Sequence, residues 1–480
     1  MRLSANTSYL FKLTLVATLG GLLFGYDTAV ISGTVSSLES FFVLPFGLDE
    51  MSANARLGFV VSSALIGCII GGISGGIISK KLGRRNGLIL AAVLFLLSAI
   101  GSAMPEMFLK PIGKANHTFI YIFIVYRITG GIGVGLASML SPLYIAEIAP
   151  AKIRGKLVSL NQFAIIFGML VVYFVNYYIS TQGNDSWLNM VGWRWMFASE
   201  IIPASLFLVM LIFVPDTPRS LVLKSKPKKA LDVLTKVNGF DEAKKILAEI
   251  QNTVTSKRSD KLFSFGIGII VIGILLSVFQ QFVGINVVLY YAPEIFKSMG
   301  SGTDVALLQT IIVGSVNLIF TVFAIMTVDK FGRKPLMIIG ALGMAVSMFA
   351  LGTTFFTQTI GLAALICMLI YVASFAMSWG PVCWVLLSEI FPNKIRGRAL
   401  AVAVAAQWIS NYLVSWTFPM MDKNSYLLEK FNHGFAYWIY GVMAVLAAIL
   451  VWKFVPETKG KTLEEMEKLW DKYKTLYSFG

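Results

Sequence analysis

The stretch "AEIAPAKIRGKL" (146–157) returns 242 residues later as "SEIFPNKIRGRAL" (388–400), and this repeat decides how the chain is organised. Two more pairs occur in the same order: "SKKLGRR" (79–85) with "VDKFGRKPL" (328–336), and "VPDTPRS" (214–220) with "VPETKGK" (455–461). Three motif pairs in one order indicate two halves built on one plan. We therefore place the halves at 1–215 and 262–455, joined by a hydrophilic linker at 216–261 and followed by a tail at 456–480.

The composition excludes a soluble globular protein. The 480 residues are 56% hydrophobic and only 14% charged, with a mean hydropathy of +0.75. Twelve apolar stretches approach the ~20 residues that cross a bilayer as a helix. We expect an all-α membrane protein with two six-helix bundles, whose spans cover residues 10–34, 57–79, 87–105, 118–144, 157–180, 193–214, 262–292, 304–328, 335–357, 360–388, 399–421 and 434–454.

The net charge of +15 does not indicate nucleic acid, because the basic residues follow the predicted topology. Of the 40 Lys and Arg, 32 lie in the segments that share a side with the N-terminus and 7 in the other segments. Basic segments favour the cytoplasm, so both termini are expected there. The first apolar run shows no signal-peptide cleavage site and is expected to remain as a helix.

The linker and the tail are expected to contain short amphipathic helices. Leu231, Leu234 and Val237 recur at helical spacing in the linker, as do Ile246, Leu247 and Ile250. In the tail, "TLEE" (462–465) is a capping box that typically opens a helix. These helices are interpreted as braces under the cytoplasmic face.

The repeated motifs place charged residues at the cytoplasmic ends of helices. One interpretation is topology and helix capping. The other is a lock that holds the cytoplasmic ends of the two halves together in an outward-open state and breaks when the halves rock. The candidate lock residues are Arg84, Glu147, Arg154, Arg333, Glu389 and Arg396.

Three ionisable residues of the first half lie inside predicted spans. Asp27 lies in "GGLLFGYDTAVISG" (20–33), ~10 Å below the outer surface at 1.5 Å per residue. Arg127 and Glu200 lie at nearly the same depth in two other spans. A structural ion pair is one interpretation. Because intramembrane carboxylates commonly mark ion pathways, the other is proton coupling, in which Asp27 takes up a proton when it separates from Arg127.

Amide and indole side chains gather mainly in the second half. Amides both donate and accept hydrogen bonds, and indoles stack on the apolar face of a sugar, so this set favours a neutral polyhydroxylated ligand. Each residue alone is also compatible with helix packing or an interfacial position. The set comprises Gln280, Gln281, Asn286, Asn317, Trp384, Gln407 and Trp408, with Gln162, Ile166 and Met169 on one face of a helix in the first half.

Other chemistries find no support in the sequence. The three cysteines lie in apolar spans without pairing or ligand spacing, and the two histidines are isolated, so no metal site is expected. "GGIGVG" (130–135) follows no strand and is interpreted as close helix packing, as are Gly67, Gly71 and Gly75. No nucleophile, base and orienting group converge, so we expect no enzyme, no cofactor and no nucleic-acid partner.

The motifs together resemble those of the sugar porter family of the major facilitator superfamily. "GGLLFGYDTAVISG", "YIAEIAPAKIRGKL", "QQFVGINVVLYYAPEIF", "DKFGRKPL", "GPVCWVLLSEIFPNKIRG" and "VPETKGKTLEE" occur in the family's order over essentially the whole chain. The resemblance implies two six-helix bundles around a central cavity. It also implies alternating access and proton-coupled uptake of a monosaccharide, with D-xylose as first choice, by a monomer in a bacterial inner membrane.

The resemblance also assigns roles to residues. It implies that Asp27 carries the coupled proton, with Arg127 as its partner and Glu200 as a contributor. The sugar-contacting positions it implies are Gln162, Gln280, Gln281, Asn286, Asn317, Trp384 and Gln407, surrounded by Phe24, Tyr290, Gly380 and Trp408. Met169 stands where the resemblance expects a glutamine. An uncoupled facilitator and a sugar sensor remain alternatives, although Asp27 favours coupling and the short tail disfavours a sensor.

Overall fold

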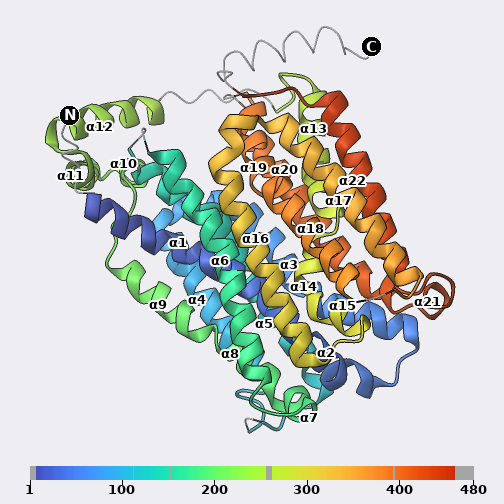
Figure 1. Ribbon diagram of the computed structural model, residues 1–480. Coiled ribbons are helices and arrows are strands. Elements are labelled where there is room, and N and C mark those ends of the chain that lie inside the picture. Colours follow the sequence, from blue (N-terminus) through green and yellow to red (C-terminus); the bar gives the residue numbers. More distant parts are fainter. Residues whose placement is uncertain are drawn as a thin grey trace.

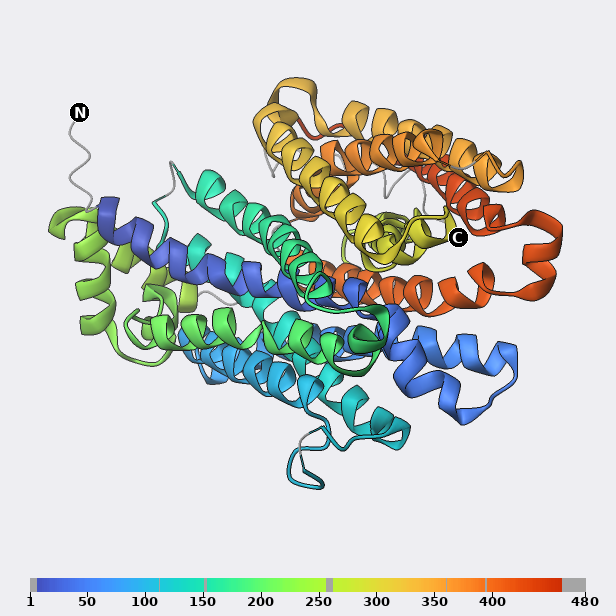
Figure 2. The same cartoon turned by 60° about the horizontal axis from the view of Figure 1, so that its bottom comes forward.

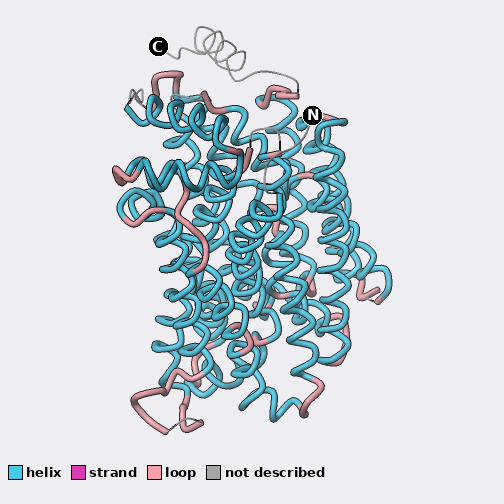
Figure 3. Tube along the Cα trace, turned by 90° about the vertical axis from the view of Figure 1, so that its left-hand side faces the viewer, coloured by secondary structure: helices cyan, strands magenta, loops and turns pink. Residues whose placement is uncertain are grey.

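The structure is a computed structural model that describes residues 7–111, 113–150, 153–255, 262–359, 361–392 and 395–459. Every regular element in these ranges is a helix (Figures 1 and 3). Twelve of the helical spans found there are long and apolar enough to cross a membrane. The prediction of twelve spans and an all-α membrane protein is therefore confirmed.

The spans are built from continuous and broken helices. The continuous ones are α3 (Glu50–Lys81), α4 (Arg84–Ala103), α5 (Ile120–Ile148), α6 (Arg154–Ser180), α16 (Thr303–Phe331), α17 (Arg333–Phe356), α20 (Arg396–Asp422) and α22 (Gly434–Phe454). The composite ones are α1 (Thr7–Val30) with η1 (Ile31–Gly33), α8 (Trp193–Ala198) with α9 (Ile201–Ile212), α13 (Ile267–Phe282) with α14 (Ile285–Tyr290), and α18 (Leu362–Met377) with α19 (Trp379–Ile390).

Short helices lie between the spans. They are α2 (Val35–Leu38), η2 (Glu39–Val43), η3 (Leu44–Phe46), η4 (His117–Phe119), α7 (Asp185–Trp187), η5 (Leu188–Gly192), α10 (Pro218–Leu223), α11 (Pro227–Asn238), α12 (Phe240–Thr255), α15 (Ala292–Ser298) and α21 (Ser425–Phe431). We call the end of the molecule that carries α10, α11 and α12 the linker end. The end that carries α7, α15 and α21 is called the opposite end (Figure 1).

The spans form two groups that follow the two halves of the sequence. In Figure 2 the helices coloured blue to green lie together, and those coloured yellow to red lie beside them. Two predicted spans, 57–79 and 193–214, begin earlier in the structure. The second span begins at Glu50 because Asp49 caps it by accepting a hydrogen bond from the Ser52 backbone N–H at 3.1 Å. The sixth begins at Asp185 because α7 and η5 continue into α8.

Glycines let α3 and α5 cross in near-contact. A methyl group added at Gly67 would lie 2.0 Å from the Ile128 carbonyl oxygen, and one at Gly131 would lie 1.8 Å from that of Ala64. No larger residue fits at these positions without moving a backbone. This confirms that "GGIGVG" serves helix packing, and the crossing fixes the part of α5 that carries Arg127.

The seventh span breaks where the sequence has Gly284. Its φ of +92° lies in the left-handed region that favours glycine, and α14 restarts immediately after it. Asn286 therefore lies on a short helix that is separate from the one carrying Gln280 and Gln281. The sixth span also breaks, between α8 and α9, at Ser199 and Glu200.

The linker forms the short helices expected from its periodicity. In α11, Val233, Leu234 and Val237 are buried, and the Lys236 ammonium lies 6.0 Å from the centre of the Tyr9 ring of α1. The linker thus packs against the first half at the linker end. The helix predicted from "TLEE" lies outside the described residues.

Candidate functional site

Asp27 of α1 and Arg127 of α5 form a fully buried ion pair. Arg127 Nη1 donates to Asp27 Oδ1 at 2.8 Å, and Nη2 donates to the Asp27 backbone carbonyl at 3.2 Å. The side chain of Asp27 is 0% exposed and that of Arg127 is 1% exposed. The Arg127 guanidinium carbon also lies 5.3 Å from the centre of the Phe197 ring. The pairing predicted from matched depth is therefore confirmed.

Glu200 supplies a second buried carboxyl beside this pair. It lies at the break between α8 and α9, is fully buried, and interacts electrostatically with Asp27 and Arg127. Its carboxyl can hydrogen-bond that of Asp27 when one of the two is protonated, and neither Glu200 oxygen has another partner among the described residues. Its neighbour Ser199 hydrogen-bonds to the Tyr26 hydroxyl at 2.7 Å. One buried guanidinium can compensate the charge of only one buried carboxylate. The second carboxyl is therefore expected to hold a proton.

The amides of the second half form one hydrogen-bonded network. Gln280 of α13 donates to the Trp379 carbonyl at 2.9 Å and accepts from the amide of Gln407 of α20. Gln281 lies 3.4 Å from the Gln280 side-chain oxygen and accepts from the Asn286 amide of α14. The Gln407 side-chain oxygen remains without a partner in the described part of the chain. The network thus joins three spans and retains free hydrogen-bonding capacity.

Other predicted sugar positions surround this network to different degrees. Trp408 is buried, and its ring centre lies 5.7 Å from that of Phe24, which joins the two halves. Asn317 and Met169 are also buried, whereas Gln162 and Gly380 are half-buried. Trp384 is 37% exposed, so it lies at a more open place than the amides.

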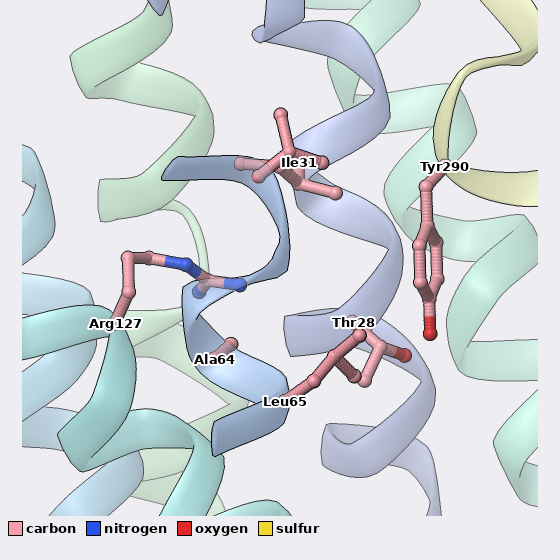
Figure 4. Close-up of a pocket in the computed structure, with 7 residues that line it drawn as sticks. Thr28, Ile31, Ala64, Leu65, Arg127 and Tyr290 are labelled. Carbon is pink, nitrogen blue, oxygen red and sulfur yellow. The ribbon is translucent and has the colours of Figure 1, made fainter. Parts of the chain in front are cut away.

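A small cavity lies between the ion pair and the second half. Its volume of ~10 Å³ is about that of one water probe. Figure 4 shows Arg127 of α5 on one side and Tyr290 of α14 on the other, with Thr28, Ile31, Ala64 and Leu65 between them. Tyr290 also contacts Asn411, whose amide nitrogen lies 3.5 Å from the Tyr290 hydroxyl. Tyr290 therefore links the surroundings of Arg127 to α20.

The charged motifs at the linker end pair within each half. Arg84 bonds Glu147 at 2.8 Å, and Arg333 bonds Glu389 at 2.8 Å. Arg154 and Arg396 donate to carbonyls at the ends of the preceding spans, at Ala149 and Phe391. The repeat is thus reproduced in three dimensions, with Arg84 and Arg333 in equivalent pairs.

A further acidic residue supports each of these pairs. Asp216 accepts hydrogen bonds from the Arg84 and Arg85 backbone N–H groups at 3.1 and 3.2 Å. Burial alone would raise the pKa of Asp216, but hydrogen bonds from Lys224, Ser220 and Arg85 outweigh it and lower the pKa. In the second half, Glu457 accepts in the same way from the backbone of Arg333 and Lys334. Sequence reasoning missed both acids, although the repeated "VPDT" and "VPET" contained the signal.

The two halves are held together at the opposite end. Lys423 Nζ lies 2.5 Å from Glu39 Oε2, and the Asn54 amide donates to the Lys423 carbonyl at 3.2 Å. Further bonds join Ser36 with Glu294 at 2.6 Å, Ser180 with Asp304 at 3.1 Å, and Trp416 with the Ala55 carbonyl at 3.0 Å. The pathway to the site is therefore closed at this end.

Broken spans, a buried ion pair within one bundle and a polar network in the other are typical of a membrane transporter. The family model described as "Sugar (and other) transporter" matches residues 13–470. The chain therefore belongs to this family and is a sugar transporter of the major facilitator superfamily, not an enzyme. No group of three or more His, Cys, Asp or Glu in the described ranges could hold a metal ion.

Curated relatives extend over nearly the whole chain. The chain is 64% identical over 479 residues to the D-xylose-proton symporter of Escherichia coli strain K12, covering 98% of each protein. It is 42% identical to the glucose facilitated diffusion protein of Zymomonas mobilis, covering 96% of the chain and 97% of the relative. It is 40% identical to the arabinose-proton symporter of Bacillus subtilis, with 98% and 97% covered.

Solved structures of the Escherichia coli xylose transporter share the fold. Its inward open conformation matches with a TM-score of 0.88 at 63% identity, covering 96% of this chain and all of that one. The complex with 6-bromo-6-deoxy-D-glucose matches with a TM-score of 0.84 at 65% identity, covering 97% and 100%.

Proposed function

We propose that this chain carries D-xylose together with a proton across a bacterial inner membrane by alternating access. In this proposal a single chain is the working unit, both termini and the linker end are cytoplasmic, and the opposite end faces outward. The observation that carries the proposal is the fully buried Asp27–Arg127 pair. The high identity to a D-xylose-proton symporter supports both the sugar and the coupling.

The ion pair is suited to coupling because its two partners differ in chemistry. Arg127 stays protonated, whereas Asp27 can hold or release a proton depending on whether Arg127 is near. Glu200 adds a second buried carboxyl that competes for the same guanidinium. A change that separates Asp27 from Arg127 therefore favours uptake of a proton, and their return favours its release.

The sugar is expected to bind at the amide network between the two halves. Gln280, Gln281, Asn286 and Gln407 offer donors and acceptors to hydroxyl groups, and Trp384 offers an apolar face to C–H groups. Asn317, Tyr290, Gly380, Trp408, Phe24, Gln162 and Met169 complete the proposed lining. Because these residues come from both halves, rocking of one half against the other changes the access to the site.

Uptake into proteoliposomes tests this function against the uncoupled alternative. When the solution on the proposed outer side, which the opposite end faces, is more acidic, purified protein is expected to accumulate labelled D-xylose to a higher concentration than on that side. Without the gradient, uptake should stop at equal concentrations. A facilitator, as the Zymomonas mobilis relative is named, would stop there under both conditions. If the final level of uptake were the same with and without the pH gradient, the proposal would be rejected.

We further propose that the Arg84 and Arg333 networks form a cytoplasmic lock in the outward-open state. Replacing Arg333 by Gln is expected to favour the inward-open state, because the proposed lock across the halves needs a charge that Gln lacks; the bond to Glu389 lies within one half. A cysteine at Gly155, where an added side chain meets open space, should then react faster with a thiol reagent from the cytoplasmic side. Lys245→Gln, in an exposed pair with Glu242, is the control. Equal labelling of both variants would contradict the lock.

Met169 is proposed to reduce hydrogen bonding to the sugar, because a thioether replaces an amide at the cavity wall. Met169→Gln is expected to change the affinity for D-xylose relative to D-glucose by about 3- to 10-fold, the range of one net hydrogen bond. Calorimetric titration of both sugars measures the ratio. Met190→Gln, at an exposed methionine, should leave it unchanged. An unchanged ratio in Met169→Gln would remove Met169 from the specificity site.

A further inference from the structure

Ser98 of α4 is a buried hydroxyl beside the proton site that no motif identifies. Its side chain is 0% exposed, and its Oγ has no hydrogen-bond partner among the described residues. Ser62 and Ser63 of α3, also buried, donate to a carbonyl of their own helix at 2.7 and 2.8 Å, whereas Ser32, Ser102, Ser141 and Ser277 resemble Ser98 in having no partner among the described residues. A buried hydroxyl without a partner is costly and requires an explanation.

Gly130 of α5 brings this hydroxyl toward Asp27. A methyl group added at Gly130 would lie 2.3 Å from Ser98 Oγ and 3.1 Å from Asp27 Oδ1. Both oxygens therefore border the same small space, which exists only because residue 130 has no side chain. In the present state Asp27 Oδ1 is bound by Arg127 at 2.8 Å, while Asp27 Oδ2 has no partner in the described part of the protein other than the Glu200 carboxyl.

We propose that Ser98 is a positioning residue that hydrogen-bonds Asp27 when Asp27 is protonated and has separated from Arg127. A hydroxyl can donate to the carbonyl oxygen of a neutral carboxyl or accept from its O–H. Its acceptor role is possible only with the neutral form, for which a guanidinium is a poor partner, and this role stabilises the protonated carboxyl. The proton comes from the outer solution, binds an Asp27 carboxylate oxygen as the bond to Arg127 breaks, and is released when that bond forms again; Ser98 itself exchanges no proton. This inference rests on the proposed proton coupling and adds a residue to it.

Other titratable groups near Asp27 do not take this role in the structure. The groups that interact with Asp27 from the packed elements are Arg127 of α5, Glu200 between α8 and α9, Cys68 of α3 and Tyr290 of α14. Arg127 serves the ionised carboxylate, and Glu200 can bond Asp27 when one of the two carboxyls is protonated, but its own charge changes with pH. Ser98 remains a neutral partner at every pH.

The test compares Ser98→Ala with a matched serine. Ser141 of α5 is also 0% exposed and without a partner among the described residues, and it also faces a glycine: a methyl group at Gly20 would lie 2.2 Å from its Oγ. The other contact at Gly20 is the Phe207 ring, not an acid. Ser141→Ala therefore removes the same atom in similar packing, away from Asp27.

The measured quantity is D-xylose uptake by proteoliposomes as a function of outer pH. Ser98→Ala is expected to move the half-maximal pH of uptake ~0.5–1 unit toward acid, because the protonated form loses about one net hydrogen bond. Ser141→Ala should leave it in place. In an Asp27→Asn background, where no proton is exchanged, Ser98→Ala should leave sugar exchange unchanged.

Two results would overturn the inference. One is an unchanged pH profile in Ser98→Ala while the wild type remains gradient-driven, which would leave the proton coupling intact. The other is an equal loss of exchange with and without Asp27, which would indicate a purely structural hydroxyl. If the wild type itself showed no dependence on the gradient, the proposed coupling and this inference would fall together.

Discussion

Asp27→Asn is expected to abolish uphill accumulation of sugar while exchange of sugar across the membrane continues. The amide resembles the neutral carboxyl in shape and hydrogen bonding, but it cannot release a proton. With one proton per sugar, a gradient of one pH unit supports up to about 10-fold accumulation in the wild type. The variant should reach only equal concentrations on both sides. Gradient-driven uptake and counterflow in proteoliposomes measure the two activities separately.

Glu106→Gln provides a matched control for this variant. Glu106 is also 0% exposed and bound to an arginine, Arg194, at 2.9 Å, but it lies beyond the end of α4 and anchors the Gly113 backbone. Its loss is expected to affect stability and to leave the accumulation ratio of the folded protein unchanged. Undiminished accumulation by Asp27→Asn, or the same defect in both variants, would contradict the assignment of coupling to Asp27.

Gln280→Ala is expected to weaken sugar binding by about 10- to 100-fold. Gln280 is 2% exposed, and its amide contacts the Trp379 carbonyl, Gln281 and Gln407 at once. Truncation leaves these groups unpaired and disorders the donors offered to the sugar, and each buried unpaired group costs ~1–3 kcal/mol. Quenching of tryptophan fluorescence or calorimetry with D-xylose measures the affinity.

Gln182→Ala is the control for the loss of a glutamine. Gln182 is exposed near the opposite end and donates only to Tyr178 and Thr181. Its replacement should leave the affinity unchanged. If Gln280→Ala bound D-xylose as tightly as the wild type, the amide network would be a helix-packing device and the sugar site would lie elsewhere.

The sequence predicted the proton pair because depth in a membrane can be counted along the chain. Asp27 and Arg127 lie at one depth, and a buried charge needs a partner, so their pairing follows from residue number. Counting does not give the direction in which a side chain points around a helix. Ser98 was therefore not predicted, since its position relative to Gly130 and Asp27 depends on how α4, α5 and α1 are rotated.

The amide network was predicted only in part, for a similar reason. The sequence placed Gln280, Gln281, Asn286 and Gln407 in one candidate set. It did not show which amides bond to one another, such as Gln407 to Gln280 and Asn286 to Gln281. The predicted Trp384 is more exposed than the amides. This difference could not be predicted, because a pattern of residue types contains no information on depth within a cavity. The linker helices, by contrast, were predictable because their periodicity is local.

The contacts that close the opposite end are mostly polar, and this affects how readily they open. Glu39, Lys423, Ser36, Asp304 and their partners meet through hydrogen bonds and charges, which water can replace when the surfaces part. Opening an apolar interface of equal area would expose it to water at a cost of ~25 cal/mol per Å² of apolar surface. A closure made of such contacts is expected to open at a lower cost, which suits a protein proposed to alternate between two orientations.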